Sequence, residues 1–160
     1  MYKGHDNVDV QWTTDTAYIE AVARRGDVLP WIVDDEGERR AEQGPLAPPG
    51  ARFLEVRVAG QRCGYFVFEE KAPKVYVGHA CLTGDCRGRM AVVAGKKALD
   101  VLWKEGALRV LGFIPGTPLH RRVLMYAGAL GGRLLGWQRR AWKRHGKVFD
   151  MNVIEFGRCV

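Results

Sequence analysis

The sequence predicts an α/β (α+β) fold in which a mixed, mostly antiparallel central sheet of about six strands is flanked by three to four helices. Its 160 residues, 47% of them hydrophobic, suit one ordinary globular domain. Residues 53–82 are predicted to form three consecutive strands with short connections, as antiparallel strands have, and residues 53–58 alternate between two sets of side chains. From Arg89 the apolar period becomes that of a helix, and helical and extended segments then alternate.

The N-terminal part is expected to form one short helix and a surface loop. Residues 13–15 are N-cap types, and apolar residues between Ala17 and Val22 recur at helical spacing, so this helix is expected to end near Gly26. Residues 34–50 turn polar and then rich in proline and glycine, which is typical of a loop within a domain.

The other elements follow in chain order. Strands are expected at 53–58, 64–68, 75–82 and 110–114, helices at 89–105 and 118–130, and a closing hairpin at 133–141 and 148–156. No internal repeat or second domain is visible. We therefore assign residues 1–160 to a single domain, with the helix and Pro/Gly-rich loop in 1–50 and the sheet, long helix and hairpin in 53–156.

The charge is strongly asymmetric along the chain. The net charge is +7, from 25 basic and 18 acidic residues, and most of the excess lies in residues 86–160. Such asymmetry is typical of a protein with an anionic partner, which is a nucleic acid, a phosphorylated cofactor or an acidic protein surface. The alternative is a solvated basic surface without a partner.

Several protein classes are excluded by composition. No stretch approaches the ~20 apolar residues of a membrane helix, and residues 1–9 lack the apolar core of a signal peptide, so we expect a soluble protein that is not exported. The cysteines form no CxxC pair and are expected to be reduced thiols in a cytoplasm; they are Cys63, Cys81, Cys86 and Cys159. No metal site is expected, because no histidine has a partner at ligand spacing.

One junction combines features that bind anions. A strand ends at Leu82, a tight loop spans residues 83–86, and Arg87-Gly88-Arg89 opens the long helix. Unpaired N–H groups at a helix start, the helix dipole and two arginines together favour a phosphate or pyrophosphate. The alternative is a plain strand-to-helix turn in which Gly88 serves only the geometry.

This junction resembles the signature Q/R-x-x-G-x-G/A of the GNAT superfamily of acyl-CoA-dependent N-acetyltransferases. The resemblance covers roughly residues 53–156, including Phe113-Ile114-Pro115 on the following strand and the helix from Ala127 to Gly131. It implies acetyl-CoA as cofactor, with its pyrophosphate on helix-start amides. The cofactor-binding residues implied are Leu82, Arg87, Gly88, Arg89, Met90 and Ala91.

Within that superfamily the chain is most similar to phage-encoded members, on the early Pro30-Trp31 step, His79 and the Gly146–Asp150 segment. It departs from the signature at Met90 and Val92, which stand where the family has small residues that let the cofactor approach. A bulky Met90 is expected to crowd the pyrophosphate.

The resemblance also implies catalytic residues. His79, three residues before Leu82, is the candidate base that deprotonates the acceptor amine, and a hydrogen-bonded sheet histidine is the alternative. Tyr126 is the candidate acid for the departing thiolate. It lies one residue before the position of the family's tyrosine, here Ala127, so a role in the core is equally open.

The sequence thus predicts transfer of an acetyl group from acetyl-CoA to an unknown amine by direct attack. The acceptor pocket is expected from roughly Tyr18 to Arg40. The alternative function is a catalytically silent GNAT-fold protein of a phage virion or capsid assembly, in the host cytoplasm or the particle, with phage structural proteins or a second copy as partners. A DNA-binding module rests on charge alone, so nucleic acid is not an expected partner, and neither is a membrane.

Overall fold

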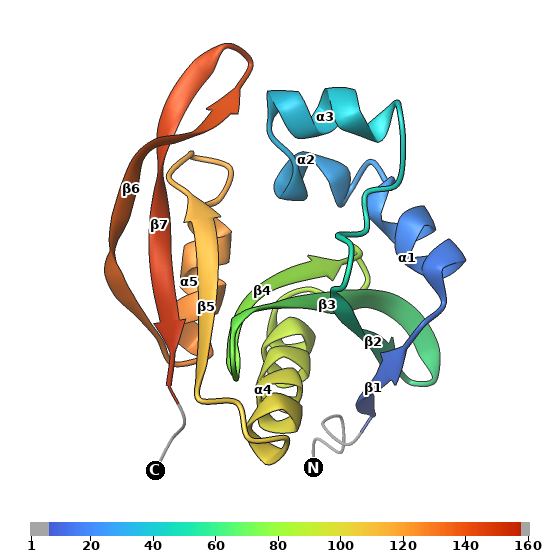
Figure 1. Ribbon diagram of the computed structural model, residues 1–160. Helices are drawn as coiled ribbons and strands as arrows, with labels where there is room; N and C mark the ends of the chain where they lie inside the picture. The colour runs from blue at the N-terminus through green and yellow to red at the C-terminus, as the bar shows by residue number, and fades with distance from the viewer. Residues whose placement is uncertain (1–6, 158–160) are drawn as a thin grey trace.

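The computed structural model describes residues 7–157, which form seven strands and five helices (Figure 1). The strands are β1 (Val8–Thr13), β2 (Arg52–Val58), β3 (Gln61–Ala72), β4 (Val75–Leu82), β5 (Arg109–Pro115), β6 (Gly132–Arg144) and β7 (Lys147–Phe156). The helices are α1 (Thr16–Ala23), α2 (Leu29–Ile32), α3 (Asp35–Ala41), α4 (Arg89–Lys104) and α5 (Arg121–Ala129).

All strands belong to one sheet in the order β1-β2-β3-β4-β5-β7-β6. Neighbouring strands are antiparallel except β4 and β5, which run parallel. The expected class, a mixed and mostly antiparallel sheet with helices, is confirmed, and the sheet has one strand more than expected. That strand is β1, where Val8, Val10 and Trp12 alternate with polar residues and pair along β2.

The helices also outnumber the expectation, because residues 29–41 fold into α2 and α3, whereas no helix was predicted there and residues 34–50 were expected to form a loop. Asp34 caps α3 by accepting a 2.7 Å hydrogen bond from the Gly37 N–H, and acidic residues fill its first turn. Capping and charge, rather than an apolar face, stabilise this helix. The expected loop is therefore confined to residues 42–51.

Two apolar layers cover the two faces of the sheet. On one face, α4 packs on the first strands through Ala94, Ala98 and Leu102 against Leu54, Val56, Phe66 and Phe68. On the other face, α1 packs through Ile19 and Val22 against Phe53, Tyr65, Val67 and Cys81. Side chains alternate along a strand, so His79 shares the α1 face with Cys81, while Leu82 belongs to the α4 face.

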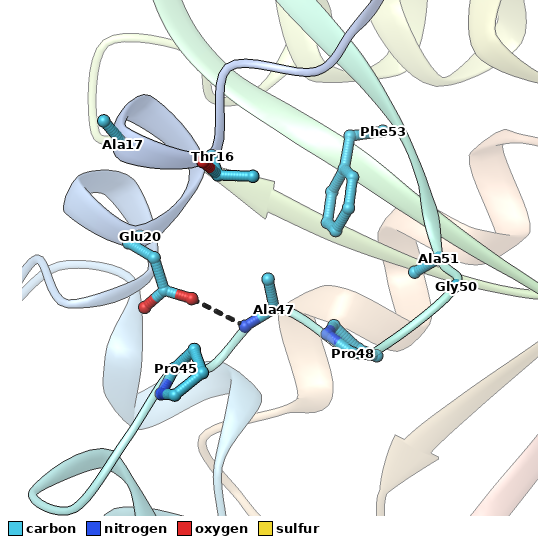
Figure 2. Close-up of a pocket in the computed structure, with 9 residues that line it drawn as sticks. All are labelled: Thr16, Ala17, Glu20, Pro45, Ala47, Pro48, Gly50, Ala51 and Phe53. Atoms are coloured by element: carbon cyan, nitrogen blue, oxygen red, sulfur yellow. Dashed lines mark hydrogen bonds between the residues drawn. The ribbon is translucent and has the colours of Figure 1, made fainter.

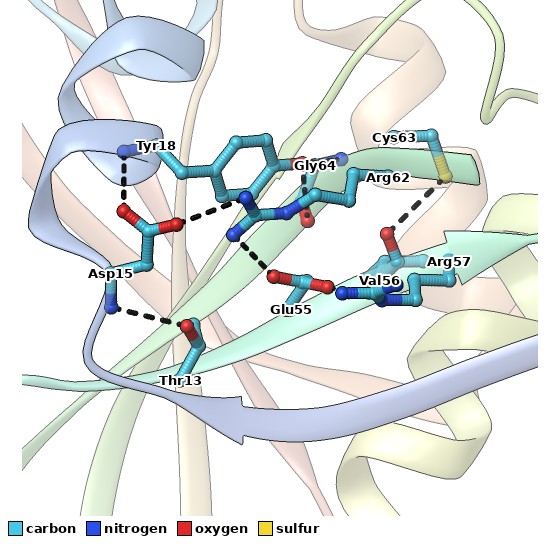
Figure 3. A network of polar contacts seen from close by, with 9 residues as sticks. All are labelled: Thr13, Asp15, Tyr18, Glu55, Val56, Arg57, Arg62, Cys63 and Gly64. Carbon is cyan, nitrogen blue, oxygen red and sulfur yellow. Dashed lines mark hydrogen bonds and ion pairs between the residues drawn. The ribbon is translucent and has the colours of Figure 1, made fainter. Parts of the chain in front are cut away.

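A polar network holds α1 to the β2–β3 hairpin (Figure 3). The Tyr18 hydroxyl accepts a hydrogen bond from the Gly64 N–H at 2.8 Å and donates to the Gly64 carbonyl at 3.3 Å. The Arg62 guanidinium lies 3.6 Å from the centroid of the Tyr18 ring and pairs with the buried carboxylate of Glu55. Because Gly64 is opposite Leu82 in the ladder, this network fixes α1 beside the end of β4.

Residues 27–41, here called the bridging segment, reach across to the tip of the β6–β7 hairpin (Figure 1). The Asp35 carboxylate accepts hydrogen bonds from the N–H groups of His145 at 2.8 Å and Gly146 at 3.1 Å. A second carboxylate of α3 pairs with a guanidinium of β6. The N-terminal helices are thus anchored to the last strands of the sheet.

His120, which precedes α5, makes a second anchor for this segment. Its Nε2 donates to the Trp31 carbonyl at 3.0 Å, and in the neutral ring its Nδ1 accepts from the Thr117 hydroxyl at 2.7 Å. The imidazole packs edge-to-face between Trp31 and Trp142, with ring centroids 5.8 Å apart in both pairs. Burial of the ring favours its neutral form.

Acidification is expected to destabilise the protein through His120. Burial lowers the pKa of His120 below its ordinary value of 6.5, although the Trp31 carbonyl opposes the shift. The unfolded chain takes up this proton at a higher pH than the folded chain. Stability is therefore complete above about pH 6.5 and falls as the pH drops toward the lowered pKa.

Urea unfolding at several pH values checks this expectation. His120→Gln should be less stable at neutral pH and show a flatter dependence between about pH 5 and 6.5. The matched control is His145→Gln at the exposed hairpin turn, which should keep the slope of the unaltered chain. An unchanged slope in His120→Gln would show that another group titrates.

The remaining sequence expectations concern thiols, membranes and metals. Cys63, Cys81 and Cys86 are buried free thiols, whereas Cys159 and residues 1–6 lie outside the described residues. Across residues 7–157, no helix combines the length and apolarity needed to cross a membrane. The same part of the chain holds no group of three or more metal-binding side chains.

Candidate functional site

The parallel strands β4 and β5 separate partway along their length. They pair only where Val75–Val77 meets Arg109–Leu111, although β4 continues to Leu82 and β5 to Pro115. For the part of the chain that the structure describes, no further pairing joins these two strands. The backbone groups beyond the pairing lack a sheet partner on that side, and such free strand edges bind extended ligands by main-chain hydrogen bonds.

The loop that follows β4 opens α4 with free amide donors. Gly88 is the N-cap, at φ 60° and ψ −129°, a conformation that suits glycine, and no side chain caps this helix. Among residues 7–157, no hydrogen bond is made by the backbone N–H groups from Arg87 to Ala91. These donors, together with the helix dipole, form a site for an anion.

The two arginines of the junction are exposed and have different surroundings. The Arg87 guanidinium donates a 3.0 Å hydrogen bond to the Asp27 carbonyl and lies 5.8 Å from the centroid of the Trp31 ring. Arg89 has no ion pair or side-chain hydrogen bond to any described residue. Arg87 is therefore held beside the loop, whereas Arg89 remains available to an anionic ligand.

Asp27, between α1 and α2, contacts this loop although no sequence pattern pointed to it. Its carboxylate accepts a 2.8 Å hydrogen bond from the Gly84 N–H and pairs with Arg25 at 2.8 Å. Arg25 and then the Gly84 N–H lower the pKa of Asp27 to about 2, so the carboxylate is ionised at neutral pH. Aspartates in short polar turns are common, so the sequence alone does not indicate that Asp27 contacts Gly84.

Met90 lies in the first turn of α4, where the sequence predicted a bulky side chain beside the cofactor. Its side chain is half-buried and packs against the apolar layer beneath α4, next to the buried Ala91. Met90, Ala94 and Ala98 lie on one helical face, which accounts for this orientation. With the thioether turned toward the core, the free donors of the first turn and the exposed guanidinium of Arg89 have the chemistry to bind a diphosphate.

His79 lies on β4 within the stretch that has separated from β5. Its side chain is exposed. Partial loss of hydration beside the surrounding protein lowers the pKa of His79, and the negative charge of Glu69 opposes this shift. The ring is therefore predominantly neutral at pH 7, with a nitrogen able to accept a proton. An exposed neutral imidazole beside an open strand edge has the properties of a general base.

Tyr126 places its hydroxyl between α5 and α4. The hydroxyl is buried without a hydrogen-bond partner in residues 7–157, and a Cβ on Gly95 would lie 2.4 Å from it. Burial raises the pKa of Tyr126 far above its ordinary value. The ring also packs on the apolar layer beneath α4, so Tyr126 has the core contacts that the sequence left open.

A pocket of about 570 Å³ lies on the α1 face of the sheet (Figure 2). Its lining residues are Thr16, Ala17, Glu20, Pro45, Ala47, Pro48, Gly50, Ala51 and Phe53. The Glu20 carboxylate braces one wall by accepting a 2.8 Å hydrogen bond from the Ala47 N–H (Figure 2). Phe53 pairs with Val67, and Val67 pairs with His79. Phe53 in the pocket wall and His79 therefore lie on the same face of the sheet, two strand spacings or about 10 Å apart along the backbone.

Comparison with known proteins gives fold relatives only. No family model and no curated protein matches the sequence. A spermidine N-acetyltransferase chimera from Vibrio cholerae and hSSAT superposes with a TM-score of 0.73 and 12% identity, over 94% of this chain and 95% of that one. A GNAT-family acetyltransferase from Bacillus anthracis gives 0.69 and 16%, over 97% of each. The chain has the GNAT fold.

A third solved structure, from Salmonella typhimurium, was reported as an acetyltransferase with its cofactor acetyl-CoA. It superposes with a TM-score of 0.64 and 15% identity, over 95% of this chain and 94% of that chain. In the GNAT fold of the present chain, the separated strands β4 and β5 and the free amides of α4 lie in consecutive segments. The fold thus brings the expected cofactor-binding residues together at one end of β4, and Tyr126 and His79 come from α5 and β4.

Proposed function

We propose that the protein is an N-acetyltransferase that moves an acetyl group from acetyl-CoA to an amine. The observation that carries this proposal is the junction itself: a strand edge freed from its parallel neighbour leads directly into a helix start with unpaired amides. The first feature suits an extended, amide-containing ligand arm, and the second suits a diphosphate. Few ligands combine both parts.

The binding residues follow from the geometry. The N–H groups from Arg87 to Ala91 would hold the diphosphate, with charge supplied by Arg89, and the edge of β4 at Leu82 would align the pantetheine arm. When bound, acetyl-CoA supplies an acetyl thioester. The acceptor amine would reach it from the face of the sheet that carries His79.

Proton transfer is assigned to His79. A neutral imidazole nitrogen takes the proton of the acceptor ammonium, which makes the amine a nucleophile. The lowered pKa of His79 keeps most of the molecules in the active form at pH 7. Tyr126 is proposed as the acid that protonates the leaving thiolate. Its hydroxyl has no hydrogen-bond partner in residues 7–157 and is protonated at neutral pH, as a proton donor must be, although burial raises its pKa and so makes it a weaker acid.

The catalytically silent alternative, a structural component of a phage particle, has lost one of its motives. One motive was the pair of bulky residues at the signature, Met90 and Val92, and of these Met90 is half-buried and packs against the core. The structures compared above carry no indication of a phage origin or assembly. The proposed acetyl acceptor is an amine.

Isothermal titration of the full chain with acetyl-CoA tests the proposal. The unaltered protein should bind, and Arg87→Glu/Arg89→Glu should bind about 30-fold or more weakly, a loss of ~2 kcal/mol. The matched control is Arg121→Glu/Arg122→Glu, which reverses the same charge at an exposed site outside the junction and should bind within about twofold of the unaltered chain. Absence of binding by the unaltered chain would refute the enzyme.

A further inference from the structure

Two contacts from a single residue hold both ends of the loop that precedes α4. The Asp27 carboxylate accepts the Gly84 N–H at 2.8 Å, and the Asp27 carbonyl accepts the Arg87 guanidinium at 3.0 Å. Gly84 follows the end of β4 by two residues, and Arg87 directly precedes the N-cap Gly88. The loop is therefore clamped at its start and at its end.

The internal contacts of the loop are few. Thr83 bonds to the Cys63 carbonyl, and the Cys86 N–H bonds to the Thr83 carbonyl at 3.0 Å. The segment that carries the free donors, from Arg87 onward, has no side-chain cap. Three contacts from outside the loop hold it: the bond of Thr83 to the Cys63 carbonyl, the burial of the Cys86 side chain in the core, and the contacts of Asp27, whose carboxylate holds Gly84 and whose backbone carbonyl holds Arg87.

The sign of the charge on Asp27 makes this role unusual. A carboxylate close to an anion site repels the ligand, so electrostatics alone disfavour Asp27 at this position. Arg25 pairs with the carboxylate and reduces this cost. The charge of Asp27 disfavours an anionic ligand. If Asp27 favours binding, it does so through the geometry of the loop.

We propose that Asp27 is a positioning residue that fixes the loop of residues 84–88 so that the amides opening α4 converge on one anion. The proposal rests on the proposed function where acetyl-CoA is named as that anion. It also assigns the turn between α1 and α2 a role in cofactor binding, together with α2, which carries Trp31 beside Arg87. Asp27 touches neither the thioester nor the acceptor, so its effect is on cofactor affinity.

Titration of acetyl-CoA into Asp27→Ala, Asp27→Asn and Asp85→Ala tests this assignment. Asp27→Ala should weaken binding about tenfold and raise the KM for acetyl-CoA to the same extent, with kcat at saturating cofactor unchanged within about twofold. Asp27→Asn keeps an oxygen acceptor for the Gly84 N–H and should recover most of the affinity. Asp85→Ala removes the same charge from the loop without removing a recorded contact and should bind equally or more tightly.

Hydrogen exchange gives a readout that does not depend on catalysis. Amides of the peptide covering residues 84–91 should exchange faster in Asp27→Ala than in Asp85→Ala or the unaltered chain. Equal binding and equal exchange in Asp27→Ala and the unaltered chain would overturn the proposal while leaving the enzyme intact. If the unaltered chain does not bind acetyl-CoA, the proposed function fails, and the exchange rates alone decide whether Asp27 positions the loop.

Discussion

Replacing His79 with glutamine is expected to lower kcat by about 10²- to 10⁴-fold. The amide keeps the size and polarity of the side chain but cannot take a proton from the acceptor. Binding of acetyl-CoA should be unchanged within about twofold, because the binding groups lie beyond Leu82. Steady-state kinetics with a generic primary amine, together with titration of the cofactor, separates the two effects.

The pH profile sharpens this test. Since loss of hydration lowers the pKa of His79, kcat/KM should rise with pH, with a midpoint below 6.5, and then reach a plateau. This acid limb should be absent in His79→Gln. His145→Gln, at the exposed turn of the hairpin, is the matched control and should keep both the rate and the limb. Full activity of His79→Gln would show that His79 is not the general base and has only a structural role in the sheet.

Gly64→Ala is expected to destabilise the protein by about 3 kcal/mol. Gly64 adopts φ +131°, and an added Cβ would lie 2.4 Å from the Cys81 carbonyl oxygen and 2.8 Å from the Leu82 Cα. Both neighbours are backbone atoms of β4, so relief requires the strand to move. The Gly64 N–H also donates a hydrogen bond to the Tyr18 hydroxyl of α1, so the substitution should also weaken the packing of α1 on the sheet.

Urea unfolding at neutral pH measures this effect. Gly128→Ala is a suitable control, because Gly128 lies within α5, has open space around it and does not have a positive φ. That change should stabilise the protein by about 0.5–1 kcal/mol, since alanine favours helix. Gly64→Ala as stable as the unaltered chain would mean that β3 and β4 can separate at little cost.

The elements that the sequence predicted well are those with a strong local pattern. The long helix α4 presents one apolar stripe, and β2, β3 and β4 are runs rich in strand-forming residues with short connections, so their types were correct. By contrast, α3 has no apolar face. Its stability comes from the Asp34 cap and from contacts to the hairpin, which a scan for periodicity does not detect.

The candidate site divides in the same way. The amides that open α4 are contiguous in the chain, so a strand followed by Arg87-Gly88-Arg89 was enough to indicate them. The contact of Asp27 with Gly84 joins residues 57 apart, and that of His120 with Trp31 joins residues 89 apart. Neither has a local pattern. The direction of Met90 was available from helical phase, because Met90 and Ala94 share the buried face.

The bridging segment has a consequence for how the protein is made. Asp35 bonds to amides 110 and 111 positions later, in the turn that joins the last two strands. During synthesis, residues 27–41 emerge from the ribosome long before that turn exists. Their hydrogen bonds to the turn therefore cannot form when they first appear. The anchoring of the N-terminal helices to the hairpin is consequently a late event, completed only after residues 145 and 146 have been translated.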